Sequence, residues 1–203
     1  YISPVHGYKI TEFWSDARVC DPFDPDDVQL CMNLLRSFHE KKLTVEHSFD
    51  LFGQIEFYES LWDGNQSIFP DYQNTKENVF SLKPLIDSLP KDWALTHIDP
   101  VPDNFLFLDE GIRLIDWEYA GMQDPHLDIA MFAVYAMYDR THVEQLIDAY
   151  FPEGCSHDVR TKIYCYISVA GLLWSNWCEF KRIHGVEFGE YSLRQYRYAK
   201  EYY

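Results

Sequence analysis

The sequence predicts a mostly α-helical α+β domain that carries a single β-hairpin near its middle. Three observations support this fold class. Of the 203 residues 47% are hydrophobic, the long apolar segments repeat at helical spacing, and two short apolar runs, FLFL and IRLI, flank a glycine-containing turn. A chain of this length can bury a substantial core. We therefore expect a globular protein built mainly from helices.

The first expected elements are a strand and a helix. Residues 8–14 are rich in aromatic and β-branched side chains and follow Gly7, which favours a strand. A helix should begin at Pro25, because Asp24 is a suitable N-cap and proline fits the first helical position. One face of this helix carries the apolar side chains of Val28, Cys31, Leu34, Leu35 and Phe38.

The remaining elements follow from periodicity and from turn residues. A second helix is expected over residues 50–62, and a third follows Thr75 and runs toward Leu89, disturbed near Pro84. Two strands, residues 105–108 and 112–115, should form the hairpin around Asp109-Glu110-Gly111. The later helices are predicted over residues 127–139, 143–150, 158–183 and 191–202.

Charge and cysteine content limit the classes of partner and the compartment. The formal net charge of −16 argues against a nucleic-acid binder, because such a surface repels phosphate backbones, and suits a small cationic ligand better. For most acidic residues, improved solubility is an equally simple explanation. Five cysteines without a CxxC pair indicate reduced thiols in a cytoplasmic protein. The apolar runs are too short for a membrane span, and we expect no signal peptide.

Polar residues gather at the two outer ends of the predicted hairpin. Asp99 lies in a proline-flanked loop before the first strand, Asn104 ends that loop, and Asp116 follows the second strand. A hairpin brings its outer ends together, so these oxygen ligands should converge on one site. They suit Mg²⁺ with nucleotide phosphates better than zinc. Individually, each could simply cap a turn or start a strand.

Phosphoryl transfer requires such a set: a metal that neutralises phosphate oxygens and a carboxylate that accepts the proton of the attacking hydroxyl. Asp99 is the candidate base, and Asn104 and Asp116 are the candidate metal ligands. His97, two residues before the base, is expected to brace the loop.

These motifs also resemble a known family. HIDPVPDN, residues 97–104, resembles the HxDxxxxN catalytic loop of protein-kinase-like small-molecule kinases, and LIDWEY, residues 114–119, resembles their metal-binding IDxE segment. The resemblance is to bacterial choline kinases of the LicA type, relatives of the choline/ethanolamine kinases. It covers nearly the whole chain, because it also includes the segments DPHLDIA, LLRSFHEKKLTVEHSFDLF and IEFYESLW.

The resemblance implies the C-terminal lobe of a protein-kinase-like fold and the ATP-dependent, Mg²⁺-assisted phosphorylation of a small alcohol. It assigns the base role to Asp99 and the metal to Asn104 and Asp116, with Glu118 nearby. It also implies that Asp128 anchors the catalytic loop.

The choline pocket is implied by aromatic residues late in the chain. Trp174 and Trp177 lie three residues apart on a helix, and aromatic faces hold a quaternary ammonium that cannot be hydrogen-bonded. Such a pair is also common in a helical core. Tyr191 is a further cage candidate by resemblance, and Tyr135 and Tyr138 are lesser candidates, since both can be explained by helix packing. Ethanolamine could instead use a carboxylate such as Glu118.

The nucleotide side of the site is expected to be incomplete. Residues 1–16 resemble the inter-lobe strand and hinge, in which the backbone at Glu12, Phe13 and Trp14 would face adenine, and residues 17–203 resemble the helical lobe with the choline pocket. The sequence contains neither a glycine-rich phosphate loop nor a matching strand lysine. We therefore expect an N-terminal lobe to precede the chain, and the chain alone to be inactive.

Two other functions remain open at this point. The lobe could belong to an aminoglycoside kinase or another small-alcohol kinase, which would share HxDxxxxN without needing the tryptophan pair. It could also be a non-catalytic cation-binding module that retains the loop.

Overall fold

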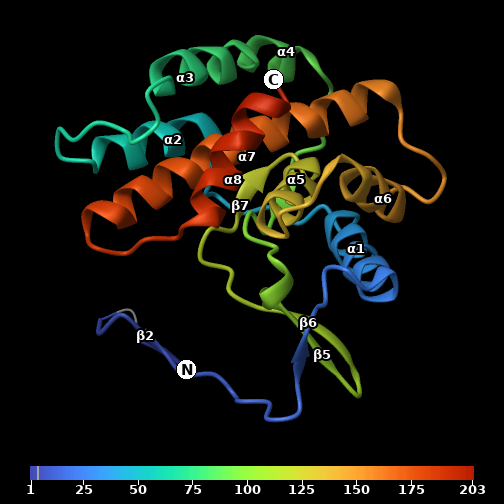
Figure 1. The fold of residues 1–203 in the computed structure, drawn as a ribbon. Helices are drawn as coiled ribbons and strands as arrows, with labels where there is room; N and C mark the ends of the chain where they lie inside the picture. Colours follow the sequence, from blue (N-terminus) through green and yellow to red (C-terminus); the bar gives the residue numbers. More distant parts are fainter. Residues whose placement is uncertain (4) are drawn as a thin grey trace.

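The computed structural model describes residues 1–3 and 5–203 and confirms a mostly helical α+β fold (Figure 1). In chain order the elements are β1 (Ile2–Ser3), β2 (Tyr8–Lys9), β3 (Arg18–Val19), α1 (Pro25–His39), α2 (Leu51–Ser60), α3 (Tyr72–Ser81), α4 (Lys83–Ser88), β4 (Ala94–Thr96), the 3₁₀ turn η1 (Pro102–Asn104), β5 (Phe105–Leu108), β6 (Gly111–Leu114), β7 (Gly121–Gln123), α5 (His126–Tyr135), α6 (Arg140–Tyr150), α7 (His157–Ile183) and α8 (Glu190–Glu201).

The core is organised around the long helix α7. Helices α5, α8 and α2 pack against it, and its middle turns are buried from Tyr166 through Trp174. In Figure 1 the helices form one body, while β5, β6 and the N-terminal segment lie together on one side of it. The catalytic motifs therefore lie where the hairpin joins the helical body.

Helix α1 forms as predicted, because local signals set its start. The carboxylate of Asp24 accepts a hydrogen bond from the backbone N–H of Asp26, and Pro25 occupies the first turn. Val28, Cys31 and Leu35 are buried on its inner face. Helix α2 likewise begins after its N-cap Asp50.

The expected third helix was wrong at its start and right about a disturbance near Pro84. It starts at Tyr72 rather than after Thr75, and a separate short helix, α4, begins at Lys83. Thr75 is buried inside the helix, where its hydroxyl bonds to that of Tyr196 on α8. Pro84 cannot donate a backbone hydrogen bond to the preceding turn, so the helical ladder restarts there.

The expected strand over residues 8–14 was also wrong in its extent. Only Tyr8–Lys9 is a strand, paired with Ile2–Ser3. Ile10 still donates to the carbonyl of Tyr1, but the following residues have no partner strand, and the Phe13 side chain is 88% exposed. Aromatic and β-branched composition cannot form a strand where no neighbour supplies hydrogen bonds.

The hairpin forms as expected, and its register brings the two motifs together. Phe105 pairs with Leu114 and Leu108 with Gly111, so β6 starts and ends one residue earlier than predicted. Beyond the last pair, the Ile115 N–H donates to the carbonyl of Asn104 at 3.0 Å. A second strand pair, β4 with β7, lies beneath the loop.

The cysteines form no disulfide among the described residues, as expected from the sequence. All five cysteines are free thiols, and four of them are buried. Across residues 1–3 and 5–203, no helix combines the length and apolar character needed to span a bilayer.

Candidate active site

The loop that carries Asp99 is held by a buried carboxylate on α5. The two oxygens of Asp128 accept hydrogen bonds from the backbone N–H groups of His97 (3.0 Å) and Ile98 (2.7 Å). The Nε2–H of His39 donates to the same carboxylate at 2.9 Å. Ile98 has a φ of +73°, which is strained for a β-branched residue and persists only when neighbours enforce it. The structure thus places Asp128 where it can fix the direction of Asp99.

His97 links the loop to the second motif. Its Nε2–H donates to the carbonyl of Ile115 at 2.9 Å, and its ring lies edge-on to Trp117 with centroids 4.5 Å apart. Burial lowers the pKa of the imidazole, so the ring is neutral at pH 7. This geometry agrees with a bracing role.

Asn104 and Asp116 meet at the open end of the hairpin. The side-chain amide of Asn104 donates to the Asp99 carbonyl at 2.9 Å and points toward the Asp99 carboxylate at 3.5 Å. Asp116 follows with a φ of +63°, and its half-exposed carboxylate lies 4.0 Å from the Lys9 ammonium. The hairpin therefore brings Asp99, Asn104 and Asp116 together, as the pattern predicted.

The electrostatics of Asp99 suit a base that works near neutral pH. Burial raises the pKa of its carboxyl to about 7, and the negative charges of Asp116, Glu118 and Asp128 add to the rise. The amide of Asn104 opposes it. A carboxyl whose pKa lies close to the working pH is the most effective general base.

The donor chemistry at the hairpin end fits Mg²⁺. Within the described residues, the amide oxygen of Asn104 accepts no hydrogen bond. The side chain of Asp116 is half exposed to solvent. Mg²⁺ keeps several waters and takes one or two protein oxygens plus substrate phosphates. Among residues 1–3 and 5–203, no cluster of three or more His, Cys, Asp or Glu side chains forms a metal cage. Asn104 and Asp116 offer oxygens of the kind that Mg²⁺ takes together with water and substrate phosphates.

A cavity of about 450 Å³ opens beside Asp99. Four other predicted residues line it, namely Glu118, Trp174, Trp177 and Tyr191. The lining also includes Tyr135 and three residues that the sequence reasoning did not assign to it: Tyr119, Met137 and Phe188.

Of the two lesser cage candidates, Tyr135 lines the cavity, whereas Tyr138 is buried elsewhere and donates to the carbonyl of Pro22. Tyr119 directly follows Glu118, and this adjacency was the available signal. No local pattern marks Met137 or Phe188 as cavity residues.

The aromatic walls are held in place by their neighbours. The Trp174 ring is edge-on to Trp177, with centroids 6.1 Å apart, and its Nε1–H donates to the sulfur of Met131. Tyr119 is edge-on to Trp174, and its hydroxyl shares a hydrogen bond with that of Tyr58 at 3.2 Å. Rings fixed in this way bind a ligand with little loss of side-chain freedom.

The residues expected to face adenine lie outside the cavity beside Asp99. Glu12 and Phe13 are exposed and Trp14 is partly buried, and none of the three lines the cavity beside Asp99. Their role stays a prediction.

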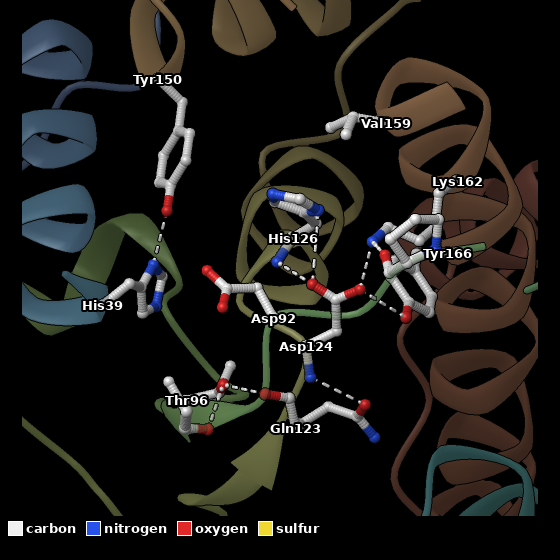
Figure 2. A network of polar contacts seen from close by, with 12 residues as sticks. His39, Asp92, Thr96, Gln123, Asp124, His126, Tyr150, Val159, Lys162 and Tyr166 are labelled. Carbon is white, nitrogen blue, oxygen red and sulfur yellow. Dashed lines mark hydrogen bonds and ion pairs between the residues drawn. The ribbon is translucent and has the colours of Figure 1, made fainter. Parts of the chain in front are cut away.

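A second buried polar network links the strands next to the site to the long helix α7. Lys162 on α7 forms an ion pair with Asp124 at 2.6 Å, and the Tyr166 hydroxyl donates to the same carboxylate. Figure 2 shows both side chains reaching Asp124 from the long helix. The backbone N–H of Asp124 donates to the side-chain oxygen of Gln123. The backbone carbonyl of Gln123 accepts a hydrogen bond from the hydroxyl of Thr96. This network ties β4 and β7 to α7, just before the helix that carries Asp128.

Comparison with known proteins identifies the family of the chain. Residues 42–164 match the profile described as "Phosphotransferase enzyme family". The chain is 26% identical over 203 aligned positions to Protein LicA of Haemophilus influenzae. That match covers 93% of this chain and 59% of the relative, so the chain spans less than two thirds of the relative's length.

Two solved structures share the fold at higher identity. The choline kinase LicA from Streptococcus pneumoniae is 29% identical with a TM-score of 0.81, over 94% of this chain and 68% of that one. A structure of LicA in complex with AMP is 28% identical with a TM-score of 0.86, over 100% of this chain and 71% of that one. Because the profile covers more than half of the sequence, the chain belongs to the phosphotransferase enzyme family.

Proposed function

We propose that this chain is the substrate-binding lobe of an ATP-dependent kinase that phosphorylates choline or a similar amino alcohol. One observation carries the proposal: a single cavity has Asp99 in its wall together with the rings of Trp174, Trp177 and Tyr191. A quaternary ammonium is attracted to aromatic faces, with about 0.5 to 2 kcal/mol per contact. With its ammonium among the rings, choline would present its hydroxyl to Asp99.

In the proposed reaction, the Asp99 carboxylate accepts the proton of the substrate hydroxyl. Asn104 holds Asp99 through its amide and, with Asp116, offers oxygens to Mg²⁺. When bound, Mg²⁺ neutralises charge on the phosphates of ATP. Glu118, which lines the cavity, adds negative charge that favours a cationic substrate.

The nucleotide part of the proposal rests on the LicA relative that binds AMP. We assign residues 1–16 to the inter-lobe segment, with the backbone of Glu12, Phe13 and Trp14 toward adenine, and residues 17–203 to the helical lobe. The sequence holds no glycine-rich loop and no matching lysine. By this proposal, the chain binds the alcohol and needs an N-terminal lobe for turnover.

Calorimetry tests the ligand. Choline should bind, and Trp174→Ala together with Trp177→Ala should weaken binding by about 10- to 100-fold, as expected from the loss of two cation–π contacts. Trp93→Ala removes a half-exposed tryptophan that does not line the cavity, so it serves as the matched control. Unchanged choline binding in the double variant would refute the aromatic cage.

Titrations with ethanolamine and an aminoglycoside separate the alternatives. Heat from an aminoglycoside but none from choline would favour an antibiotic kinase. Choline binding without ATP turnover, once an N-terminal lobe is supplied, would favour a non-catalytic cation-binding module.

Turnover in the two-lobe protein tests the base. Asp99→Asn should lower kcat by about 10²- to 10⁴-fold with little change in KM for choline, because the carboxamide cannot accept the proton. Asp103→Asn changes an exposed carboxylate in the same loop and is the control. If Asp99→Asn retained full turnover, Asp99 would not be the base.

A further inference from the structure

A second cavity shares one lining residue with the aromatic one. It has a volume of about 480 Å³, and its lining includes Cys178, Glu179, Arg182, Ser192 and Leu193. Of all the described residues, Phe188 alone lines both cavities. The two spaces therefore meet at this ring.

Neighbouring residues of α7 and α8 line different cavities. On α7, Trp177 lines the first cavity and the next residue, Cys178, lines the second. On α8, Tyr191 and Ser192 divide in the same way. The Phe188 ring, which lines both cavities, has its centroid 4.9 Å from that of Trp177.

Phe188 lies between two glycines that adopt left-handed backbone conformations. Phe188 lies in the connection between α7 and α8, and its ring is only partly buried. Gly185 and Gly189 on either side have φ values of +83° and +54°, and a Cβ at either position would meet nothing within 4 Å. The two glycines that flank Phe188 are therefore not enclosed by packed atoms on the side where a Cβ would lie.

The second cavity has no unpaired buried charge. The Glu179 carboxylate, 2% exposed, accepts from the Ser67 hydroxyl and the Ile68 N–H, both at 3.1 Å. Arg182 pairs with its other oxygen at 2.9 Å. The exposed Glu187 lies at the rim, and Ile68, Phe69 and Leu193 give the remaining lining its apolar character. This space suits a neutral, apolar group rather than a second cation.

We propose that the site accepts 2-hydroxyethylammonium ions in which one N-methyl group is replaced by a larger apolar group, and that this group passes Phe188 into the second cavity. The ammonium stays among the rings of the first cavity and the hydroxyl stays at Asp99, while the apolar group gains burial. This proposal rests on the proposed function, because it requires a choline-like ammonium in the aromatic cavity.

Calorimetry with two probes tests the proposal: choline and benzyl(2-hydroxyethyl)dimethylammonium. In the unmodified chain the benzyl probe should bind at least as tightly as choline and compete with it. Phe188→Ala removes the shared ring and should raise the ratio of benzyl to choline affinity about tenfold, the equivalent of about 1.4 kcal/mol.

Leu193→Trp tests the second cavity itself. Leu193 is 42% exposed on α8 and does not line the first cavity, so the larger side chain should fill the second space and lower benzyl affinity about tenfold relative to choline. Tight choline binding with a benzyl probe more than tenfold weaker, or an affinity ratio that neither variant changes, would overturn this inference and leave the proposed function standing. Absence of binding by either probe would overturn both.

Discussion

Gly171→Ala should destabilise the protein, although alanine is the better helix former. Gly171 lies in α7, where α8 approaches most closely. A Cβ at this position would lie 2.6 Å from the Cβ of Tyr198, 2.7 Å from the carbonyl oxygen of Gln195 and 2.9 Å from the backbone nitrogen of Ala199. Two of these atoms belong to the α8 backbone, so a rotamer change cannot relieve the overlap and the helices must move apart.

The size of the effect follows from two opposing terms. Replacing a helical glycine by alanine stabilises a helix by about 1 kcal/mol, whereas overpacking a core costs about 1 to 3 kcal/mol. Moving α8 also strains the hydrogen bonds from Gln195 to the carbonyl of Val134 and from Tyr198 to that of Tyr138, which places the cost at the upper end. The net loss should be about 2 kcal/mol, and the melting temperature should fall by about 6 °C for a domain of this size.

Thermal and urea unfolding measure this loss, with Ser175→Ala as the control. Ser175 lies one turn further along the same helix, is buried, and its hydroxyl has no hydrogen-bond partner among the described residues. Its removal should not lower stability. Choline affinity should also fall in Gly171→Ala, because Tyr191 is carried by α8. A Gly171→Ala protein as stable as the unmodified one would refute the close contact between α7 and α8.

Three further predictions concern the buried polar groups. Burial lowers the pKa of His126 in the folded protein to about 4, so between pH 6.5 and 4 this side chain is protonated only in the unfolded chain. The free energy of unfolding should therefore fall on acidification by up to about 1.4 kcal/mol per pH unit. Urea unfolding at pH 7 and 5 should show a smaller loss for His126→Gln than for the unmodified protein. Asp128→Asn should speed hydrogen exchange at the amides of His97 and Ile98, since the neutral side chain accepts less strongly; unchanged exchange would argue against anchoring. Lys162→Met should cost about 3 to 5 kcal/mol in urea unfolding, because it leaves the Asp124 carboxylate buried without its cation, and a stability near that of the unmodified chain would contradict this ion pair.

Part of the fold was predictable because the signals act over a few residues. The cap Asp24 and Pro25 start α1 through bonds within one turn. The range predicted for α7 from its apolar spacing, residues 158–183, differs from the observed helix by one residue at the start. The same holds for the hairpin, whose turn sets its register and brings Asn104 beside Asp116. The convergence of the oxygen ligands with Asp99 could therefore be predicted before any packing was known.

Other features depended on partners distant in the sequence. Residues 10–14 have strand composition but no neighbouring strand, and Thr75 resembles a cap but is buried against Tyr196.

The sequence by itself determined most of the helices, the hairpin and the clustering of polar residues at its open end, because capping, periodicity and turn geometry are short-range effects. Only the tertiary structure decided that Tyr119, Met137 and Phe188 join the predicted rings around one cavity, that Lys162 pairs with Asp124, and that Phe188 lines two cavities. These arrangements come from packing α5, α7 and α8 together, and side chains from separate helices acquire a common environment only when the core closes.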